Sequence, residues 1–479
     1  MQKRYKKLIE DTSLFAISSF GSKILTILLV PLYTSVLVSD EFGVADVITT
    51  TANVLYPIFS LSIYEASLRY ALDKSKNRKT VFSISMIVSL SGIAFMLVLS
   101  PLMINTKYIF GQYWWEFIGV FATITLYMCI SNYIKGCGFT KVFAIQGVVF
   151  TLFYLILNIY SLVIEKAGLS GYFVSMIIAY SVSILYMLLH TGCYKDFEFK
   201  KFDKSVLKEM LRFSIPLIPT SVAWMINASA DKYMILAFIG VGANGLYGIA
   251  HKIPSIFTTF SSLFSQAWRL SAISNYDETD RDSYYKKVYN HFSLVCIYFC
   301  FALILCSWIV AKILFKKEYF QAWIYIPPLV IAAFFAALCS FLYSLYAAAK
   351  KTKILSITSF IGAAVNIIFN LIFIRFIGAL GASIATMISY AVVWLITLRA
   401  LKSFIPNMHE TTNRIISLVL LIVCGLYYSF QGKYFYLIGP VMMLSTIMLN
   451  VRDTKELILF SKRVLIGIKN SSWRLRKNG

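Results

Sequence analysis

The chain has 479 residues, of which 59% are hydrophobic and 14% are charged, and its mean hydropathy is +0.73. A soluble protein has about 25% charged residues because its surface must be hydrated, so this composition excludes a soluble protein. The net charge of +23 indicates loops that are retained in the cytoplasm rather than a surface that binds nucleic acid.

The chain begins with a basic segment, residues 1–10, which we expect to be cytoplasmic. It leads into an apolar run without the small-residue site of a cleaved signal peptide. Apolar runs of about 20 residues follow, which a helix needs to cross a bilayer and which exceed a β-barrel strand. The runs predict an all-α polytopic membrane protein with about fourteen transmembrane helices. Their expected limits are residues 11–38, 42–70, 80–103, 114–135, 141–164, 169–191, 209–239, 244–272, 288–314, 321–348, 353–375, 379–402, 412–430 and 433–450.

The distribution of lysine and arginine supports this count. With the N-terminus inside the cell, 35 of the 45 basic residues fall in cytoplasmic segments and seven in outer segments. The other three, Lys23, Lys232 and Lys252, fall inside helices. Because one missing helix would disturb the alternation of all later segments, the bias predicts that both termini are cytoplasmic.

The chain contains an internal repeat of roughly 200–212 residues, with matching residues in the same order. The matches are Thr140, Lys141 and Asn158 with Thr352, Lys353 and Asn370; Gly168, Gly171 and Tyr180 with Gly378, Gly381 and Tyr390; Gly43 with Gly245; and Arg69 with Arg269. The repeat predicts two pseudo-symmetric six-helix bundles in the same orientation, residues 11–193 and 209–402, joined by a cytoplasmic linker, 194–208. Two helices at 412–450 and a basic amphipathic cytoplasmic tail, 451–479, follow.

Ionisable residues within the predicted helices concentrate in the first two helices of each half. They are Lys23, Asp46, Glu65, Asp231, Lys232, His251 and Lys252. A charge inside the bilayer is unfavourable, so each of these residues is a candidate for function. Polar residues around them recur every three or four positions, as in Asp46, Thr50 and Asn53. This period places them on one helix face, which predicts that four helices line a shared hydrated cavity.

Simpler roles stay open for several of these residues. Glu65 and Arg69 have the i, i+4 spacing of a surface ion pair. His251 fits a hydrogen-bonding wall residue as well as a proton carrier. Asp231 either neutralises a lysine permanently or takes up a coupling ion, H⁺ or Na⁺, in one transport state. We predict no catalytic group, metal site or cofactor. The eight cysteines show no paired spacing, so they indicate neither a disulfide framework nor a zinc motif.

The chain resembles the oligosaccharide-lipid flippases of the multidrug/oligosaccharidyl-lipid/polysaccharide exporter superfamily. The resemblance rests on the two six-helix halves with two added helices and on four local segments: Phe42-Gly43 after Asp40 and Glu41, Leu68-Arg69-Tyr70, Ile215 to Pro219, and Ser265 to Trp268. It covers about residues 10–450. It implies that undecaprenyl-diphosphate-linked sugar repeat units cross a bacterial inner membrane by alternating access, for O-antigen, capsule or exopolysaccharide.

The resemblance also implies a cationic substrate cavity, formed here by Lys23, Arg69, Lys232, Lys252 and Arg269. Cations suit a diphosphate, because ionised donors bind phosphate oxygens strongly. Asp46, Glu65, Asp231 and His251 remain candidates for ion coupling. A monomer that contacts membrane lipids and supplies a polysaccharide polymerase is expected. A lipid II-type flippase or another exporter of the same superfamily is the alternative, and a membrane polymerase or glycosyltransferase is disfavoured by the short outer loops.

Overall fold

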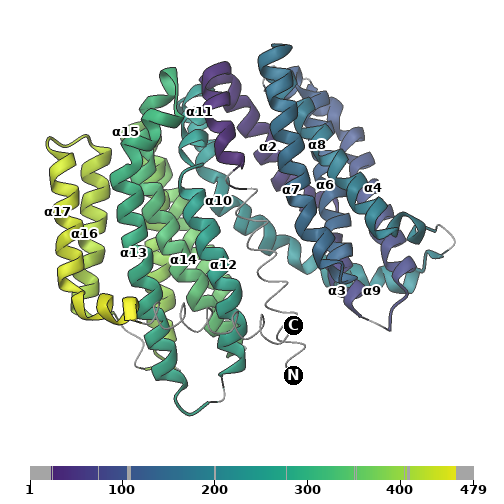
Figure 1. The fold of residues 1–479 in the computed structure, drawn as a ribbon. Helices are drawn as coiled ribbons and strands as arrows, with labels where there is room; N and C mark the ends of the chain where they lie inside the picture. The colour runs from purple at the N-terminus through teal and green to yellow at the C-terminus, as the bar shows by residue number, and fades with distance from the viewer. Residues whose placement is uncertain are drawn as a thin grey trace, which may run out of the picture.

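A computed structural model describes residues 23, 25–73, 75–104, 109–198, 201–276, 278–349, 351, 353–403, 405–406 and 410–459. Within these ranges every regular element is a helix (Figure 1). The predicted N-terminal segment, the first half of the first predicted helix and residues 460–479 of the predicted tail lie outside them. The all-α membrane fold predicted from composition is therefore confirmed for the part of the chain that the structure describes.

The first half contains the helix Leu25–Val36 and seven labelled helices. These are α2 (Ser39–Phe59), α3 (Ile63–Leu72), α4 (Arg78–Ile104), α5 (Ile109–Gln112), α6 (Trp114–Gly136), α7 (Thr140–Ile159) with a π-helical turn (Tyr160–Ile164), and α8 (Gly168–Thr191). A short 3-10 turn (Cys193–Asp196) and α9 (Lys204–Ser214) lead to the second half.

The second half begins with a 3-10 turn at Ile215–Leu217. Its helices are α10 (Ile218–Phe238), α11 (Val241–Ala250), α12 (Pro254–Ser274), α13 (Arg281–Leu314), a 3-10 segment (Lys317–Tyr325), α14 (Ile326–Ala348) and α15 (Lys353–Leu401). The chain then forms α16 (Thr412–Ser429) and α17 (Phe435–Leu449), and residues 451–459 form a helix bent by 76° from α17. Figure 1 shows α16 and α17 side by side at the outer edge of the second half.

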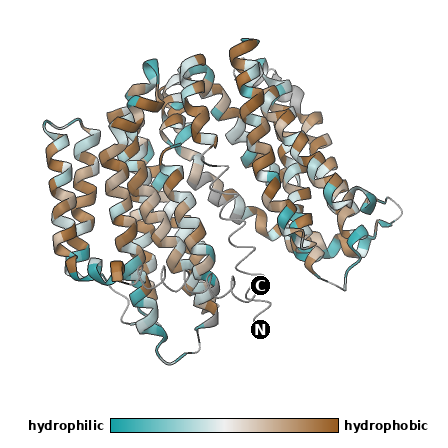
Figure 2. Cartoon of the chain, viewed as in Figure 1, coloured by the Kyte–Doolittle hydropathy of each residue, from teal (hydrophilic) through white to brown (hydrophobic). Residues whose placement is uncertain are grey.

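A described helix occupies each of the fourteen predicted ranges. In the part of the chain that the structure describes, nine helices are long and apolar enough to cross a membrane, or ten if the bent pair that includes α17 is one span. Helices α10 and α12 are not among the nine, because α10 carries Asp231 and Lys232 and α12 is rich in serine and threonine. Figure 2 shows that most helices are hydrophobic along their length and that hydrophilic residues gather at their ends.

The second and the eighth predicted helices are each interrupted, which the periodicity did not show. The second helix breaks into α2 and α3 at Leu61 and Ser62, whose φ angles are 52° and 49°. The eighth breaks into α11 and α12 just before Pro254, which cannot donate a backbone hydrogen bond. The eleventh and twelfth predicted helices, 353–375 and 379–402, are the two arms of α15, and the arms meet where the prediction separates them, at Gly378 with a φ of 61°. Only glycine adopts this left-handed conformation without strain.

The internal repeat extends to the lengths and turns of the helices. Helices α6 and α14 both contain 23 residues and begin 212 positions apart. Gly168 and Gly378, which the repeat aligns, both have positive φ, at 57° and 61°. The two groups of helices lie side by side where α2 meets α11 and spread apart toward α3 and α12 (Figure 1).

Candidate functional site at the junction of the two halves

The two halves touch most closely where α2 crosses α11. A Cβ atom on Gly43 would lie 2.1 Å from the carbonyl oxygen of Val241, and one on Gly245 would lie 2.0 Å from that of Ser39. Both pairs of aligned residues, Gly43 with Gly245 and Ser39 with Val241, are 202 positions apart. The same backbone contact is therefore made twice, as a pseudo-two-fold axis between the helices requires.

Contacts from the end of α13 and from the 3-10 segment that follows it reinforce this junction. The backbone N–H of Ser39 donates to Glu318 Oε1 at 2.7 Å, and Thr34 Oγ1 donates to the carbonyl of Leu314 at 3.1 Å. The rings of Phe42 and Tyr319 meet edge to face at 6.4 Å. With the predicted orientation, this is the outer end of the molecule, and it is closed.

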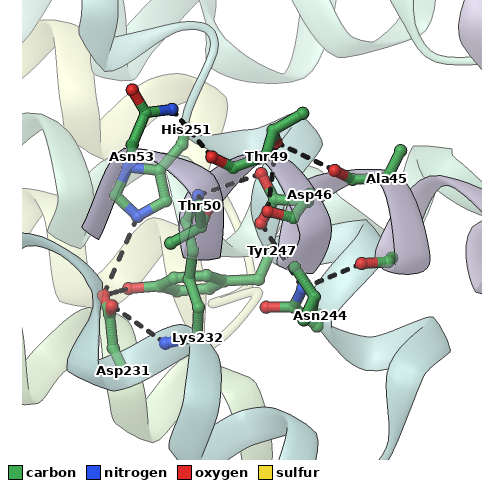
Figure 3. Close-up of polar contacts among 12 residues, drawn as sticks. Ala45, Asp46, Thr49, Thr50, Asn53, Asp231, Lys232, Asn244, Tyr247 and His251 are labelled. Atoms are coloured by element: carbon green, nitrogen blue, oxygen red, sulfur yellow. Dashed lines mark hydrogen bonds and ion pairs between the residues drawn. The ribbon is translucent and has the colours of Figure 1, made fainter. Parts of the chain in front are cut away.

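A buried ion pair joins the halves just inside the glycine contact (Figure 3). Lys232 Nζ on α10 lies 2.9 Å from Asp46 Oδ1 on α2 and donates to Thr50 Oγ1 at 3.3 Å. The two charged side chains are only 16% and 11% exposed. Asn244 Nδ2 on α11 also donates to Asp46, at 3.4 Å. The position aligned with Asp46 is Gly248, where a Cβ would lie 3.0 Å from the Asp46 carboxyl carbon, so the charge occurs on one side of the axis only.

Asp231, the neighbour of Lys232, has a different set of partners inside the second half. Its Oδ1 accepts a hydrogen bond from the backbone N–H of Lys232 at 2.9 Å, and its Oδ2 accepts from the Tyr247 hydroxyl. Thr386 Oγ1 donates to Oδ2 at 3.4 Å, and His251 Nε2 lies 3.9 Å from the same oxygen. Adjacent residues of a helix point in different directions, which explains why Lys232 pairs with Asp46 instead.

Two asparagines of α15 extend this polar cluster. Asn366 Nδ2 donates to Thr386 Oγ1 at 3.2 Å, and Asn370 Nδ2 donates to Asn366 Oδ1 at 2.9 Å. The buried Asn370 Oδ1 has no hydrogen-bond partner among the described residues. One carboxylate with neutral amide and hydroxyl oxygens is a hard-ligand set, which suits a proton or a small hard cation. No group of three His, Cys, Asp or Glu side chains that could hold a metal occurs in the described ranges.

Lys252 and Lys23 complete the charged region. Both are half-buried, and Lys252 Nζ lies 6.0 Å from the centre of the Phe42 ring. Lys252 is within electrostatic reach of Asp46, Lys232 and Lys23. Among the described residues neither lysine makes an ion pair, in contrast to Lys232.

The other candidates lie elsewhere. Arg69 is exposed and its guanidinium stacks on the Phe213 ring of α9 at 5.1 Å, while Glu65 is half-buried one turn away. The ion pair that the i, i+4 spacing of Glu65 and Arg69 allows is not formed in the described structure. Arg269 is exposed near the end of α12 and borders a cavity within the second half.

Six of the nine predicted residues are thus gathered around the junction: Lys23, Asp46, Asp231, Lys232, His251 and Lys252. Four further members were missed: Asn244, Tyr247, Asn366 and Thr386. Asn244, Tyr247 and His251 are spaced by three and four positions, so the helical period could have found the first two. Asn366 and Thr386 lie in predicted helices without a charge, where single polar residues resemble ordinary helix contacts.

Comparison with known proteins identifies the relatives of this arrangement. A family model described as polysaccharide biosynthesis protein matches residues 8–269. The chain is 22% identical over 413 residues to the membrane protein MJ1375 of Methanocaldococcus jannaschii, an alignment that covers 81% of this chain and 96% of that protein.

Two solved structures show the same fold. One is lipid II flippase MurJ in an inward closed conformation, with a TM-score of 0.67, 16% identity, and coverage of 94% of this chain and 99% of the other. The second is a transporter of the same exporter superfamily from Pyrococcus furiosus, with a TM-score of 0.57, 13% identity, and coverage of 84% and 96%.

Proposed function

Because the chain belongs to the family of polysaccharide biosynthesis proteins and has the fold of a transporter in the multidrug/oligosaccharidyl-lipid/polysaccharide exporter superfamily, we propose that it flips lipid-linked oligosaccharides. The substrate is an undecaprenyl-diphosphate-linked repeat unit, and the membrane is the inner membrane of a bacterium. The product supplies O-antigen, capsule or exopolysaccharide assembly. All fourteen helical segments span the bilayer, with both termini in the cytoplasm.

The observation that carries this proposal is the pair of lysines beside the closed junction. Lys232 is neutralised by Asp46, whereas Lys23 and Lys252 make no ion pair among the described residues. An ammonium group has three donors and no acceptor, so it recognises a diphosphate oxygen directly. Lys23 comes from the first half and Lys252 from the second, which places cations on both sides of a head group held between the halves.

The Asp46–Lys232 ion pair, which we call the latch, holds the two halves together at the outer end. When α2 and α11 separate, the pair breaks, and both charges become hydrated instead of remaining buried. Removing only one partner of a buried pair leaves an uncompensated charge and costs about 3–5 kcal/mol. The pair can form only in the state that is closed at the outer end, so substrate or a coupling ion that separates Asp46 from Lys232 shifts the balance toward opening.

Coupling is assigned to Asp231. It lies beside the polar groups Thr386, Asn366 and Asn370, and it is separated by one residue position from the latch lysine. Binding of H⁺ or Na⁺ there alters the charge next to Lys232 and so links ion uptake to the gate. His251, at 3.9 Å, forms the wall of this site.

A lipid II-type flippase is the second candidate. It is favoured by the similarity to lipid II flippase MurJ over 94% of this chain. Both candidates share a diphosphate lipid and differ in the sugar. In either case we propose a monomer that passes its product to a separate polymerase.

Complementation of flippase-null bacterial strains tests the proposal. Each strain makes one defined repeat unit, and one strain lacks its lipid II flippase. Restored surface polysaccharide in at least one repeat-unit strain, with the same abundance of the protein in all membranes, supports the proposal. Rescue of the lipid II strain alone would assign the second candidate, and rescue of none would contradict both.

A further inference from the structure

A cavity of 440 Å³ lies within the second half. It is bounded by α12, α14 and both arms of α15. Its polar wall residues are Arg269, Ser340, Tyr343, Ser359 and Tyr390. A volume of this order is typical of a small-molecule site. Neither the latch nor the Asp231 cluster contributes a residue to its lining.

In the first half, aromatic rings occupy the place that the repeat aligns with this cavity. Tyr127, Phe150 and Tyr180 pack there with ring centres 4.3–6.3 Å apart. The repeat aligns Tyr180 with Tyr390, which is retained and lines the cavity. At the offset of 212 that relates α6 to α14, Tyr127 aligns with Cys339 and Phe150 with Gly362.

Two rings of the first half are thus replaced by a thiol and a hydrogen atom in the second. Helices in a membrane are held together mainly by close packing, so an unfilled space between them loses attractive contacts. The remaining walls are not merely apolar. They carry four hydroxyl groups, two phenol rings and, at the end of α12, an arginine. Hydroxyls exchange hydrogen bonds with a sugar, and the ring faces cover its apolar surface.

Arg269 adds a charge requirement. Its side chain is exposed, and it makes no ion pair in the described part of the chain. A guanidinium fork binds a carboxylate or a phosphate in a bidentate manner. A ligand in this cavity that reaches Arg269 therefore carries an anionic group beside its sugar ring.

We propose that this cavity is a subsite for a sugar residue with an anionic substituent, which Arg269 binds while the hydroxyl groups and rings hold the sugar. The inference rests on the proposed function, since it takes the head group of a lipid-linked oligosaccharide as the ligand. It adds a specificity element within the second half to the diphosphate site between the halves.

Saturation-transfer NMR with the full chain in detergent micelles tests the subsite. The probes are glucuronate, glucose 1-phosphate and neutral glucose. We expect transfer to the ring protons of one or both anionic sugars and less to glucose. Cys339→Tyr, which restores the ring of the first half, should remove the transfer. The matched control Cys339→Ser should preserve it.

A second variant keeps the test informative if Cys339→Tyr does not fold, which a thermal melt reports. Arg269→Gln changes an exposed side chain, so it should fold normally and weaken binding of the anionic sugar about fivefold, as expected for an exposed ion pair. Equal transfer in wild type, Cys339→Tyr and Arg269→Gln would overturn the subsite.

The outcomes also separate the subsite from the proposed function. Normal sugar transfer together with failed complementation would overturn the function but not the cavity. Transfer to the head-group protons of added phosphatidylglycerol, lost in Arg269→Gln and absent for the sugars, would assign a lipid to the cavity and overturn the proposal.

Discussion

The two halves share one helical plan but fill it differently. In the first half the interior between helices is occupied by tyrosines: the ring of Tyr172 lies 5.3 Å from that of Tyr33 and 6.1 Å from that of Tyr154. At the offset of 212, Tyr154 aligns with Asn366 of the second half. There the interior holds Asp231, Thr386 and two asparagines.

The aligned residues Asn158 and Asn370 show that the interiors of the two halves differ at some positions and agree at others. Asn158 and Asn370 are both fully buried, and each donates to the carbonyl four residues earlier, at 2.7 and 2.9 Å. The shared amide is therefore part of the common helix packing. What differs is its surroundings, which are aromatic in one half and polar in the other. Under the proposed function, ion and sugar recognition reside in the second half, while both halves share the diphosphate.

The largest effect is expected where the halves share one ligand. Lys23→Ala and Lys252→Ala should each reduce export, and the double variant should abolish it, because the diphosphate loses its cations on both sides. Lys-to-Arg at either position should retain more export than Lys-to-Ala, since the charge is preserved. Export is measured as surface polysaccharide per unit of protein in the membrane. Full export by the double alanine variant would refute the shared site.

Asp231→Asn tests whether the polar interior of the second half couples transport to an ion gradient. We expect it to abolish the dependence of transport on an imposed H⁺ or Na⁺ gradient while downhill exchange of lipid continues. The readout is uptake by proteoliposomes with and without the gradient. If the variant responds to the gradient as the parent does, Asp231 only neutralises its surroundings.

Gly43→Ala tests the junction that both halves build. Its Cβ would meet the Val241 carbonyl, which is backbone and cannot move aside, so the closed state should lose about 1–3 kcal/mol, or roughly 10–100-fold in population. Gly119→Ala is the control, because its Cβ would meet only the end of the Ile177 side chain. Accessibility of an engineered cysteine near the outer end, read by an impermeant maleimide, should rise for the first variant alone.

Substitution of the aligned asparagines Asn158 and Asn370 tests whether the two interiors differ in function. Asn370→Ala and Asn158→Ala should each lower stability by about 1 kcal/mol through the lost hydrogen bond. The Oδ1 atoms of both residues have no hydrogen-bond partner among the described residues, but only Asn370 belongs to the polar cluster, so only Asn370→Ala should also change the gradient dependence. Equal transport phenotypes would show that the two asparagines serve packing alone.

The smallest effect concerns an ion pair between the start of α4 and the segment that follows α8. The Lys79 ammonium beside Glu198 holds the pKa of that carboxyl below its ordinary value. A carboxyl whose pKa is depressed by folding stabilises the folded state above its unfolded pKa, and the benefit disappears as the pH falls through the folded value. Wild type should therefore lose slightly more Tm than Glu198→Gln as the pH falls below about 4.5. A larger loss for the variant would reverse the assignment.

Much of the fold follows from the sequence because helix length and charge bias are local properties. The fourteen helical ranges and the repeat needed only apolar periodicity and aligned residues. The partner of Lys232 could not be found in this way, since Asp46 lies on another helix in the other half. The break at Leu61 and Ser62 was missed because neither residue type favours positive φ.

The candidate site was predictable only where it carries charge. Charged residues within predicted helices stand out, and six of nine gathered at the junction. Arg69 and Arg269 lie away from the junction because they belong to α3 and α12, where the two halves are spread apart. The oxygen ligands from α15 were missed because neutral side chains give no signal against ordinary helix contacts.

We propose that this chain alone moves a lipid-linked oligosaccharide across a bilayer. The direct measurement uses purified protein in sealed liposomes that contain undecaprenyl-diphosphate-linked oligosaccharide in both leaflets. An impermeant glycosidase outside the vesicles reports the accessible fraction. We expect nearly all of the lipid to become accessible to the glycosidase with wild type. With the Lys23→Ala, Lys252→Ala variant, only the outer-leaflet portion should become accessible. An accessible fraction that stays at the protein-free level with wild type would contradict it.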